Sequence, residues 1–249
     1  MSSVPMPRQT NPSQSLFRPH RYPALLAIVE ADADKLQTLS DKVGEKILKQ
    51  IISGDMPVGT ALNTTTLSES LGVSRTPLAK ALTKLTNDGI LVQPKKQSAI
   101  VSPAAERWLE QTRELRQLLE PEAASRATGH IDEETLHDLW ALSREATPTK
   151  NYEWKAAAVF FDAALHLSIA EFCGNLPMKV AIRKCWSYKR LTYHLSSKSQ
   201  AKLKKDYEHH VQILASVASG SPHETRKLMA EHLKAASKNA PLVRAAHLA

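Results

Sequence analysis

An aspartate and a histidine in the C-terminal half have the side-chain types and spacing to bind a metal ion. Asp162 and His166 are four residues apart, so on a helix they project from the same face. They lie in a stripe with Val159, Ile169 and Cys173, which predicts that this face points into the domain. A carboxylate and an imidazole in a core must be paired or ligated, because burying unpartnered polar groups is costly.

Two later histidines fit the same inward-facing pattern on separate helices. Apolar residues follow His210 by three, four and seven positions, and others precede His232 by three and four positions. His209 competes with His210, but its stripe is less regular. We therefore expect Asp162, His166, His210 and His232 to meet at the centre of a helical bundle.

This donor set admits two chemical interpretations. One carboxylate and three imidazoles suit Zn²⁺, with Ni²⁺ or Mn²⁺ as alternatives, and leave room for water or an anionic ligand. The alternative is a set of core histidines hydrogen-bonded to Asp162 or to backbone groups. An open metal site could activate water, so a metal-dependent hydrolase is the competing function. We find no further carboxylate near the motif to act as general base, and expect no enzyme.

Arg116 is the candidate residue for binding a small carboxylate effector. It interrupts a mostly apolar stripe that runs from Leu109 to Ala123. A guanidinium can form forked hydrogen bonds with a carboxylate. The alternative is an ion pair with Glu120, four residues later on the same helix. Further candidates for lining an effector pocket, or for simple core positions, are Trp186, Tyr188, Arg190 and Tyr193.

A second group of polar residues has the pattern of a DNA-recognition helix and its wing. Leu78, Leu82 and Leu85 form an inward face, and donors that could reach phosphates and base edges occupy the outward face. A solvated helix face with ordinary lysines is the alternative. The candidate DNA-binding residues are Arg75, Thr76, Lys80, Thr83, Lys84, Lys95 and Lys96.

The elements that position these donors form a winged helix-turn-helix over residues 39–102. A first helix follows Ser40 as N-cap and stops at Gly54, and a short second helix ends at Gly72. The recognition helix starts at Ser74 or Thr76, and strands at 90–92 and 99–101 flank the basic tip. This arrangement predicts binding to a double-stranded DNA operator, and two half-sites imply a homodimer.

The rest of the chain is expected to be helical, which makes the fold class mainly α. Helix formers dominate and glycines number only 8. An all-α domain is expected over 103–240, with a flexible N-terminal arm over 1–38, in which Tyr22 to Glu30 could form a short helix, and a tail over 241–249. Its six expected helices cover about 104–128, 132–146, 151–173, 177–195, 201–219 and 222–237.

Charge and composition restrict the partners and the compartment. The net charge of +8 favours a polyanionic partner. No apolar run reaches the roughly 18 residues of a membrane span, and the 2 cysteines have no paired spacing. We expect a cytoplasmic protein without a membrane partner.

Residues 39–101 resemble the DNA-binding domain of the GntR family of bacterial regulators. The resemblance rests on Pro57-Val-Gly59 and on Leu71-Gly-Val-Ser-Arg-Thr-Pro77. Two departures fall on the DNA-contacting side: Ala79-Lys80 replaces the usual Arg-Glu, and Gln97-Ser98 replaces the usual wing glycine. The resemblance therefore carries over Arg75 as a DNA contact, but neither an arginine at position 79 nor the family's operator sequences.

The later motifs are similar to the FCD effector domain of FadR- and VanR-like members of that family. Asp162-Ala-Ala-Leu-His166, followed by Gly174-Asn175, His210 and His232, matches the Asp and three His that bind a divalent metal in many FCD domains. Leu165 replaces a common Phe, and six helices match the VanR-like arrangement better than the seven-helix FadR-like one.

The resemblance also implies how the two halves work together. In many FCD domains the metal itself holds a small organic acid, and the Arg-x-x-Leu-Glu stretch at Arg116 matches the first helix of that domain. We therefore expect a transcriptional regulator, acting as a repressor, whose operator binding responds to metal and acid.

Overall fold

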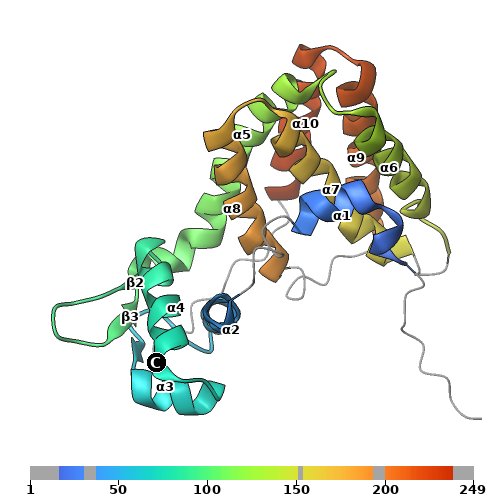
Figure 1. Cartoon of the computed structure of the whole chain (residues 1–249). Helices are drawn as coiled ribbons and strands as arrows, with labels where there is room; N and C mark the ends of the chain where they lie inside the picture. The colour runs from blue at the N-terminus through green and yellow to red at the C-terminus, as the bar shows by residue number, and fades with distance from the viewer. Residues whose placement is uncertain (1–16, 31–37, 151–153, 193–199, 238–249) are drawn as a thin grey trace, which may run out of the picture.

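The computed structural model describes residues 17–30, 38–150, 154–192 and 200–237 (Figure 1). The described chain forms a small winged-helix domain and a larger helical bundle, which lie at opposite ends of the molecule (Figure 1). A long helix, α5 (Trp108–Ala127), leads from one to the other, after the short 3₁₀ helix η2 (Pro103–Arg107). The expected mainly α fold with two domains is therefore observed.

The winged helix is built from three helices and a small sheet. Its elements are α2 (Leu39–Ser53), β1 (Ala61–Leu62), α3 (Thr64–Leu71), α4 (Arg75–Asn87), β2 (Leu91–Val92) and β3 (Ala99–Val101). Thr38, and not the expected Ser40, caps α2, because Thr38 and Asp41 satisfy each other's backbone N–H groups in a capping box. Gly54 at φ 87° ends this helix as expected.

The sheet has one more strand than the sequence pattern predicted. Strand β3 is central and pairs antiparallel with both β1 and β2, so that Ala61 faces Ile100 and Leu91 faces Val101. Strand β1 contains two residues, which is too short for an alternating pattern to be recognised. It ties the turn after α2 to the wing and so fixes the direction of the wing.

The bundle contains all six expected helices within the part of the chain that is described. After α5 come α6 (Glu133–Glu145), α7 (Trp154–Phe172), α8 (Leu176–Thr192), α9 (Gln200–Ser219) and α10 (Pro222–Ser237). Helix α7 contacts α5, α6, α8 and α9 and is buried along most of its length. The expected helical residues 151–153 and 193–195 lie outside the described residues.

A further helix joins the bundle from the segment that was expected to be a flexible arm. After the 3₁₀ turn η1 (Pro19–Arg21), α1 (Pro23–Glu30) packs on α6 and α7, and Tyr22, Leu25 and Val29 enter the core. Arg183 Nη2 also donates to Ile28 O at 2.8 Å. The arm prediction is therefore wrong for residues 17–30, because their apolar residues bury against a distant part of the chain.

Helix α8 reaches from the bundle into the winged helix. The Tyr188 hydroxyl donates to Asp88 Oδ2, and the Tyr188 ring belongs to the apolar core of the winged helix. Trp108 meets this ring edge-on, with centroids 3.9 Å apart. Because Asp88 is the C-cap of α4, the C-terminal end of the recognition helix is tied to the bundle.

Candidate metal centre and nucleic-acid interface

Three helices bring the four predicted metal ligands together. Asp162 and His166 lie one turn apart on α7, His210 lies on α9 and His232 on α10, each exposed by 6% or less. The Nε2 atom of His210 is 3.4 Å from that of His166 and 3.1 Å from that of His232. Asp162 Oδ1 lies 3.3 Å from His210 Nε2 and 3.6 Å from His166 Nε2.

These distances fit a shared divalent cation. Two nitrogens bound to a tetrahedral Zn²⁺ at about 2.1 Å are about 3.4 Å apart. All four residues can each place one ligand atom within 4.8 Å of the others. Of the two neighbouring histidines, it is His210 and not His209 whose ring belongs to this group.

Hydrogen bonds alone cannot satisfy the three facing nitrogens. His166 Nδ1 lies 2.6 Å from a Glu120 oxygen and donates to it, so a neutral His166 ring presents a lone pair at Nε2. His210 Nε2 faces two other nitrogens but carries at most one proton, and so can donate to only one of them. A single cation would accept all three lone pairs, which favours ligation over a hydrogen-bonded histidine core.

Burial keeps the histidines in the form that binds metal. Desolvation lowers the pKa of His166 to about 4, although the Glu120 carboxylate opposes the shift. Desolvation, reinforced by the neighbouring His210 and His166 rings, lowers the pKa of His232 well below 6.5. Both rings are therefore neutral at neutral pH, as a metal ligand must be.

Glu120 contacts the cluster through His166, although the sequence pattern indicated it only as a possible partner of Arg116. Its buried carboxylate accepts from Arg116 Nε, from Arg116 Nη2 at 3.1 Å, from Trp186 Nε1 at 3.0 Å and from His166. Burial alone would raise the pKa of Glu120, but the charge of Arg116 and the hydrogen bonds from Arg116 and His166 hold it well below its usual range. The only signal in the sequence was the four-residue spacing from Arg116.

Arg116, predicted to bind an effector, therefore forms the ion pair that was its alternative. The guanidinium also lies 4.5 Å from the Trp186 ring centroid, in cation–π geometry. Of the other candidate pocket residues, Tyr188 belongs to the winged-helix core. The side chain of Arg190 and all of Tyr193 lie outside the described residues.

Lys189 is a second cation at the cluster, and the sequence analysis missed it. Its Nζ lies 2.8 Å and 3.0 Å from the two oxygens of Asp162 and 3.9 Å from the Trp186 ring centroid. A lysine among several others on one helix carries no signal of this placement. A small hollow between α7 and α9, bordered by Phe161 and Tyr207, reaches Asp162 and His210 from another side.

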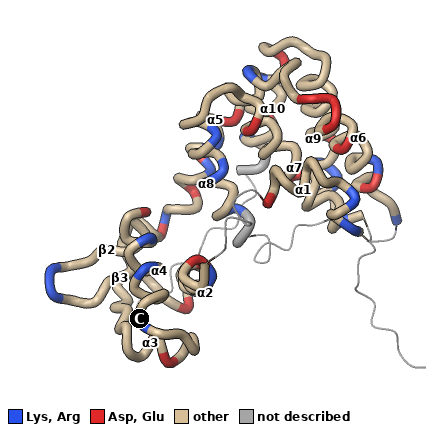
Figure 2. The backbone as a smooth tube through the Cα atoms, viewed as in Figure 1, with Lys and Arg blue, Asp and Glu red and all other residues tan. Residues whose placement is uncertain are grey.

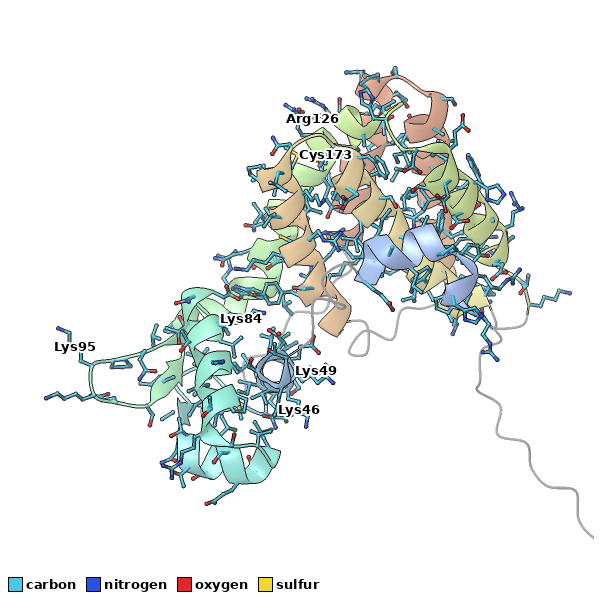
Figure 3. All side chains as sticks on the ribbon, in the orientation of Figure 1. Lys46, Lys49, Lys84, Lys95, Arg126 and Cys173 are labelled. Carbon is cyan, nitrogen blue, oxygen red and sulfur yellow. The ribbon has the colours of Figure 1, made fainter. Side chains whose placement is uncertain are left out.

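The predicted DNA-binding residues are all exposed on the winged helix. Lysine and arginine positions, coloured blue on the backbone tube, lie on α4 and at the tip of the wing (Figure 2). Lys95 projects from the end of the wing, far from the bundle, whereas Lys84 lies on the side of the domain nearer to α5 (Figure 3). The exposed residues are Arg75, Thr76, Lys80, Thr83, Lys84, Lys95 and Lys96.

Three of these side chains have partners within the domain. Arg75 Nη2 lies 3.4 Å from Thr65 Oγ1 on α3. The Thr83 hydroxyl donates to the carbonyl of its own helix at Ala79, and Lys84 Nζ pairs with Asp41 at 2.9 Å. Lys84 must therefore release the N-terminus of α2, or share its charge with Asp41, in order to contact a phosphate.

Comparisons with known proteins agree with this division of the chain. A model of bacterial regulatory proteins of the gntR family matches residues 39–101, and a model of the FCD domain matches residues 111–235. No curated protein matches the sequence.

Solved structures share the fold at low sequence identity. E. coli McbR/YncC is 22% identical with a TM-score of 0.57, over 80% of this chain and 95% of that one. Lar, described as controlling the expression of the Listeria monocytogenes agr system, is 23% identical with a TM-score of 0.54, over 81% of this chain and 95% of that one. At this identity the likeness concerns the fold alone.

Proposed function

Because the chain belongs to the GntR family of bacterial regulatory proteins, with an FCD domain behind its DNA-binding domain, we propose that it is a metal- and acid-responsive transcriptional repressor. Regulators of this family bind DNA, and FCD domains bind small-molecule effectors. The observation that carries the proposal is the convergence of three buried imidazoles and one carboxylate in a bundle that is joined to an exposed basic recognition helix.

The proposed metal is Zn²⁺, with Ni²⁺ or Mn²⁺ as alternatives, held by Asp162, His166, His210 and His232. The donor set and the spacing of the Nε2 atoms support a borderline divalent ion. Such an ion would supply a positive centre that binds an oxygen of a small acid. The described residues provide the four ligands and the neutral state of two of the rings.

The proposed effector is a small carboxylic acid that binds beside the metal. Two cations, Arg116 and Lys189, lie against Trp186 at the wall of the site and support an anionic ligand. Lys189 already contacts a carboxylate, that of Asp162. An acid that reaches the metal would compete with Asp162 for this ammonium group and would remain near the Arg116 charge.

The proposed DNA contacts are the exposed donors of α4 and of the wing. Arg75 and Thr76 lie in the first turn of α4, where a recognition helix contacts base edges, and Lys80 follows one turn later. Lys95 and Lys96 at the wing tip suit phosphate contacts. Thr83 and Lys84 lie further along α4, and Lys84 is the least available because of its pair with Asp41.

The proposed assembly is a homodimer formed through the bundle. Two helices that contact each other, α5 and α8, carry large apolar side chains in water: Leu118 is 75% exposed and Leu176 is 68% exposed, with Leu115 and Val180 nearby on the same helices. Exposed apolar side chains on adjacent helices are typical of an association surface. Two copies would present two recognition helices to paired half-sites.

Helix α8 is the proposed mechanical link between the two sites. Its Lys189 contacts Asp162 of the metal cluster, its Trp186 contacts Glu120 beside the cluster, and its Tyr188 contacts Asp88 at the end of α4. A ligand changes DNA affinity only if it binds the DNA-competent arrangement with a different affinity. A shift of α8 on ligand binding would be transmitted directly to the recognition helix.

The experiment that tests this proposal uses the gently purified full-length protein. Elemental analysis and mass spectrometry should find a divalent metal and a small acid that travel with it, and footprinting should find a protected site upstream of its own gene. Absence of any protected DNA, with or without the metal, would contradict the repressor assignment. Ester or amide hydrolysis abolished by chelation would instead favour the metal-dependent hydrolase.

A further inference from the structure

Glu120, a buried residue on α5, contacts the metal cluster without belonging to its ligands. We propose that Glu120 is a positioning residue: its carboxylate fixes the tautomer and the ring orientation of His166, so that the Nε2 lone pair faces the metal. The inference rests on the proposed metal site and assigns a role to a residue outside the ligand set.

The contact itself is short, direct and shielded from water. His166 Nδ1 lies 2.6 Å from Glu120 Oε2, and the two side chains are 0% and 1% exposed. A histidine that binds a metal through one ring nitrogen generally donates its other N–H to a carboxylate or carbonyl, which fixes the ring. Here the acceptor comes from α5, whereas His166 is on α7.

The carboxylate is itself held rigidly, which allows it to define the direction of the imidazole. Oε1 accepts from Arg116 Nε and Trp186 Nε1, and Oε2 accepts from Arg116 Nη2 and His166. Four donors therefore occupy the two oxygens. Since the two arginine bonds form a bidentate pair, rotation of the carboxylate would break several bonds at once.

The tautomer follows from this arrangement. A carboxylate with four donors around it offers no proton, so the proton in the contact belongs to His166 Nδ1. In the neutral ring, Nε2 is then bare and points toward the Nε2 atom of His210, 3.4 Å away. Without Glu120 the proton could move to Nε2, where it would block the bond to the metal.

The other ligands show why this support matters. His232 Nδ1 is buried and has no hydrogen-bond partner in the described part of the chain, so its ring lacks an equivalent acceptor. Asp162 is held by Lys189 through both oxygens. Glu120 therefore gives the His166 ring a support that the His232 ring lacks.

If Glu120 positions His166, then Arg116 acts on the metal site through Glu120. The guanidinium holds Glu120 in place and adds positive charge to the wall of the site. Removal of Arg116 should therefore lower the affinity for the metal more than the affinity for an acid. Trp186 connects the same carboxylate to α8. The positioning contact is thus built from three helices, α5, α7 and α8.

The test compares Glu120→Gln with Glu122→Gln, a matched change two positions later on the same helix, where Glu122 pairs with Arg126 and Arg226 at the surface. Zn²⁺ affinity is measured by chelator competition on the full-length protein. Glu120→Gln should weaken Zn²⁺ binding by about 10- to 100-fold, and Glu122→Gln should leave it unchanged. Equal affinity of the two variants and the wild type would overturn the role of Glu120.

A second readout needs no variant and therefore does not depend on the folding of Glu120→Gln. In the metal-free wild type, ¹⁵N NMR of the histidine rings should show His166 with its proton on Nδ1. A proton on Nε2 would overturn the proposal. A wild-type protein that binds no Zn²⁺ would contradict the metal site, whereas tight wild-type binding with unaffected Glu120→Gln would contradict only the positioning role.

Discussion

The winged helix and the bundle hold their functional residues in opposite environments. Arg75 and Lys80 are exposed on a helix whose other face, with Leu78 and Leu82, holds the domain together. In the bundle, the candidate ligands are themselves part of the interior, and Glu120 is 1% exposed. In the winged helix, different residues therefore serve stability and function. In the bundle, the same buried residues serve both.

This difference determines how each region should respond to change. A surface donor contributes to binding and little to folding, because water replaces its partner. A buried polar group that loses its partner carries its full desolvation cost. Substitutions of the exposed donors on the winged helix should therefore act on DNA affinity alone, while substitutions in the cluster should act on both metal binding and the stability of the metal-bound protein.

The largest effect is expected from removing a ligand that the others share. His210 Nε2 faces Asp162, His166 and His232. His210→Ala should weaken Zn²⁺ binding by about 100-fold or more and should abolish thermal stabilisation by Zn²⁺. Calorimetry with and without the metal measures both. The control is His209→Ala, and an equal loss in both variants would contradict the assignment of His210.

A smaller effect, confined to DNA, is expected at the start of the recognition helix. Arg75→Ala should weaken operator binding by about 10- to 100-fold, the range for a lost base contact, with no change in unfolding. Fluorescence anisotropy against selected DNA measures the affinity. Lys84→Ala serves as comparison, since its pair with Asp41 should make its effect smaller. A larger loss of affinity for Lys84→Ala than for Arg75→Ala would contradict the proposal that the first turn of α4 contacts the bases.

A substitution at the contact between the winged helix and α8 should change how strongly Zn²⁺ binding affects DNA binding, and should leave the affinity of each site nearly unchanged. Asp88→Asn weakens the contacts with Tyr188 and Lys184 of α8. Allosteric coupling is commonly about 5- to 150-fold in affinity. Asp88→Asn should reduce the Zn²⁺-dependent change in operator affinity while leaving Zn²⁺ affinity intact. Asp55→Asn, a surface change in the same domain, should retain the wild-type response, and retention by Asp88→Asn too would exclude this route.

The smallest effect is a difference in acid sensitivity. Residues 38–102 contain no histidine, whereas in the folded bundle the pKa of His166 is lowered to about 4 from 6.5. Because the unfolded chain binds the proton more tightly, this contribution to stability is complete above pH 6.5 and is lost as the pH falls toward 4. Corrected hydrogen exchange of the metal-free protein at pH 7 and pH 5 should show the bundle loosening more than the winged helix. Equal loosening would contradict the assignment.

The two regions also differed in how far the sequence predicted them. The sequence indicated the recognition helix and the four candidate ligands because apolar residues at helical spacing accompany each of them. The sequence did not predict the contacts of Glu120 and Lys189 with the cluster, because these contacts depend on which helices pack together in the folded chain. For helix α1 the sequence offered only a possible short helix within an arm, because its apolar residues identify a partner surface only when α6 and α7 are in place.

The most direct test of the account measures operator affinity and metal content on the same sample. The full-length protein is purified without chelator, its metal is quantified, and its affinity for DNA selected from a random library is determined before and after chelation and after Zn²⁺ is restored. We predict about one divalent ion per chain and a reversible change in DNA affinity on its removal. Metal-free protein, or an affinity that is the same in all three states, would contradict control of the DNA-binding domain by the buried cluster.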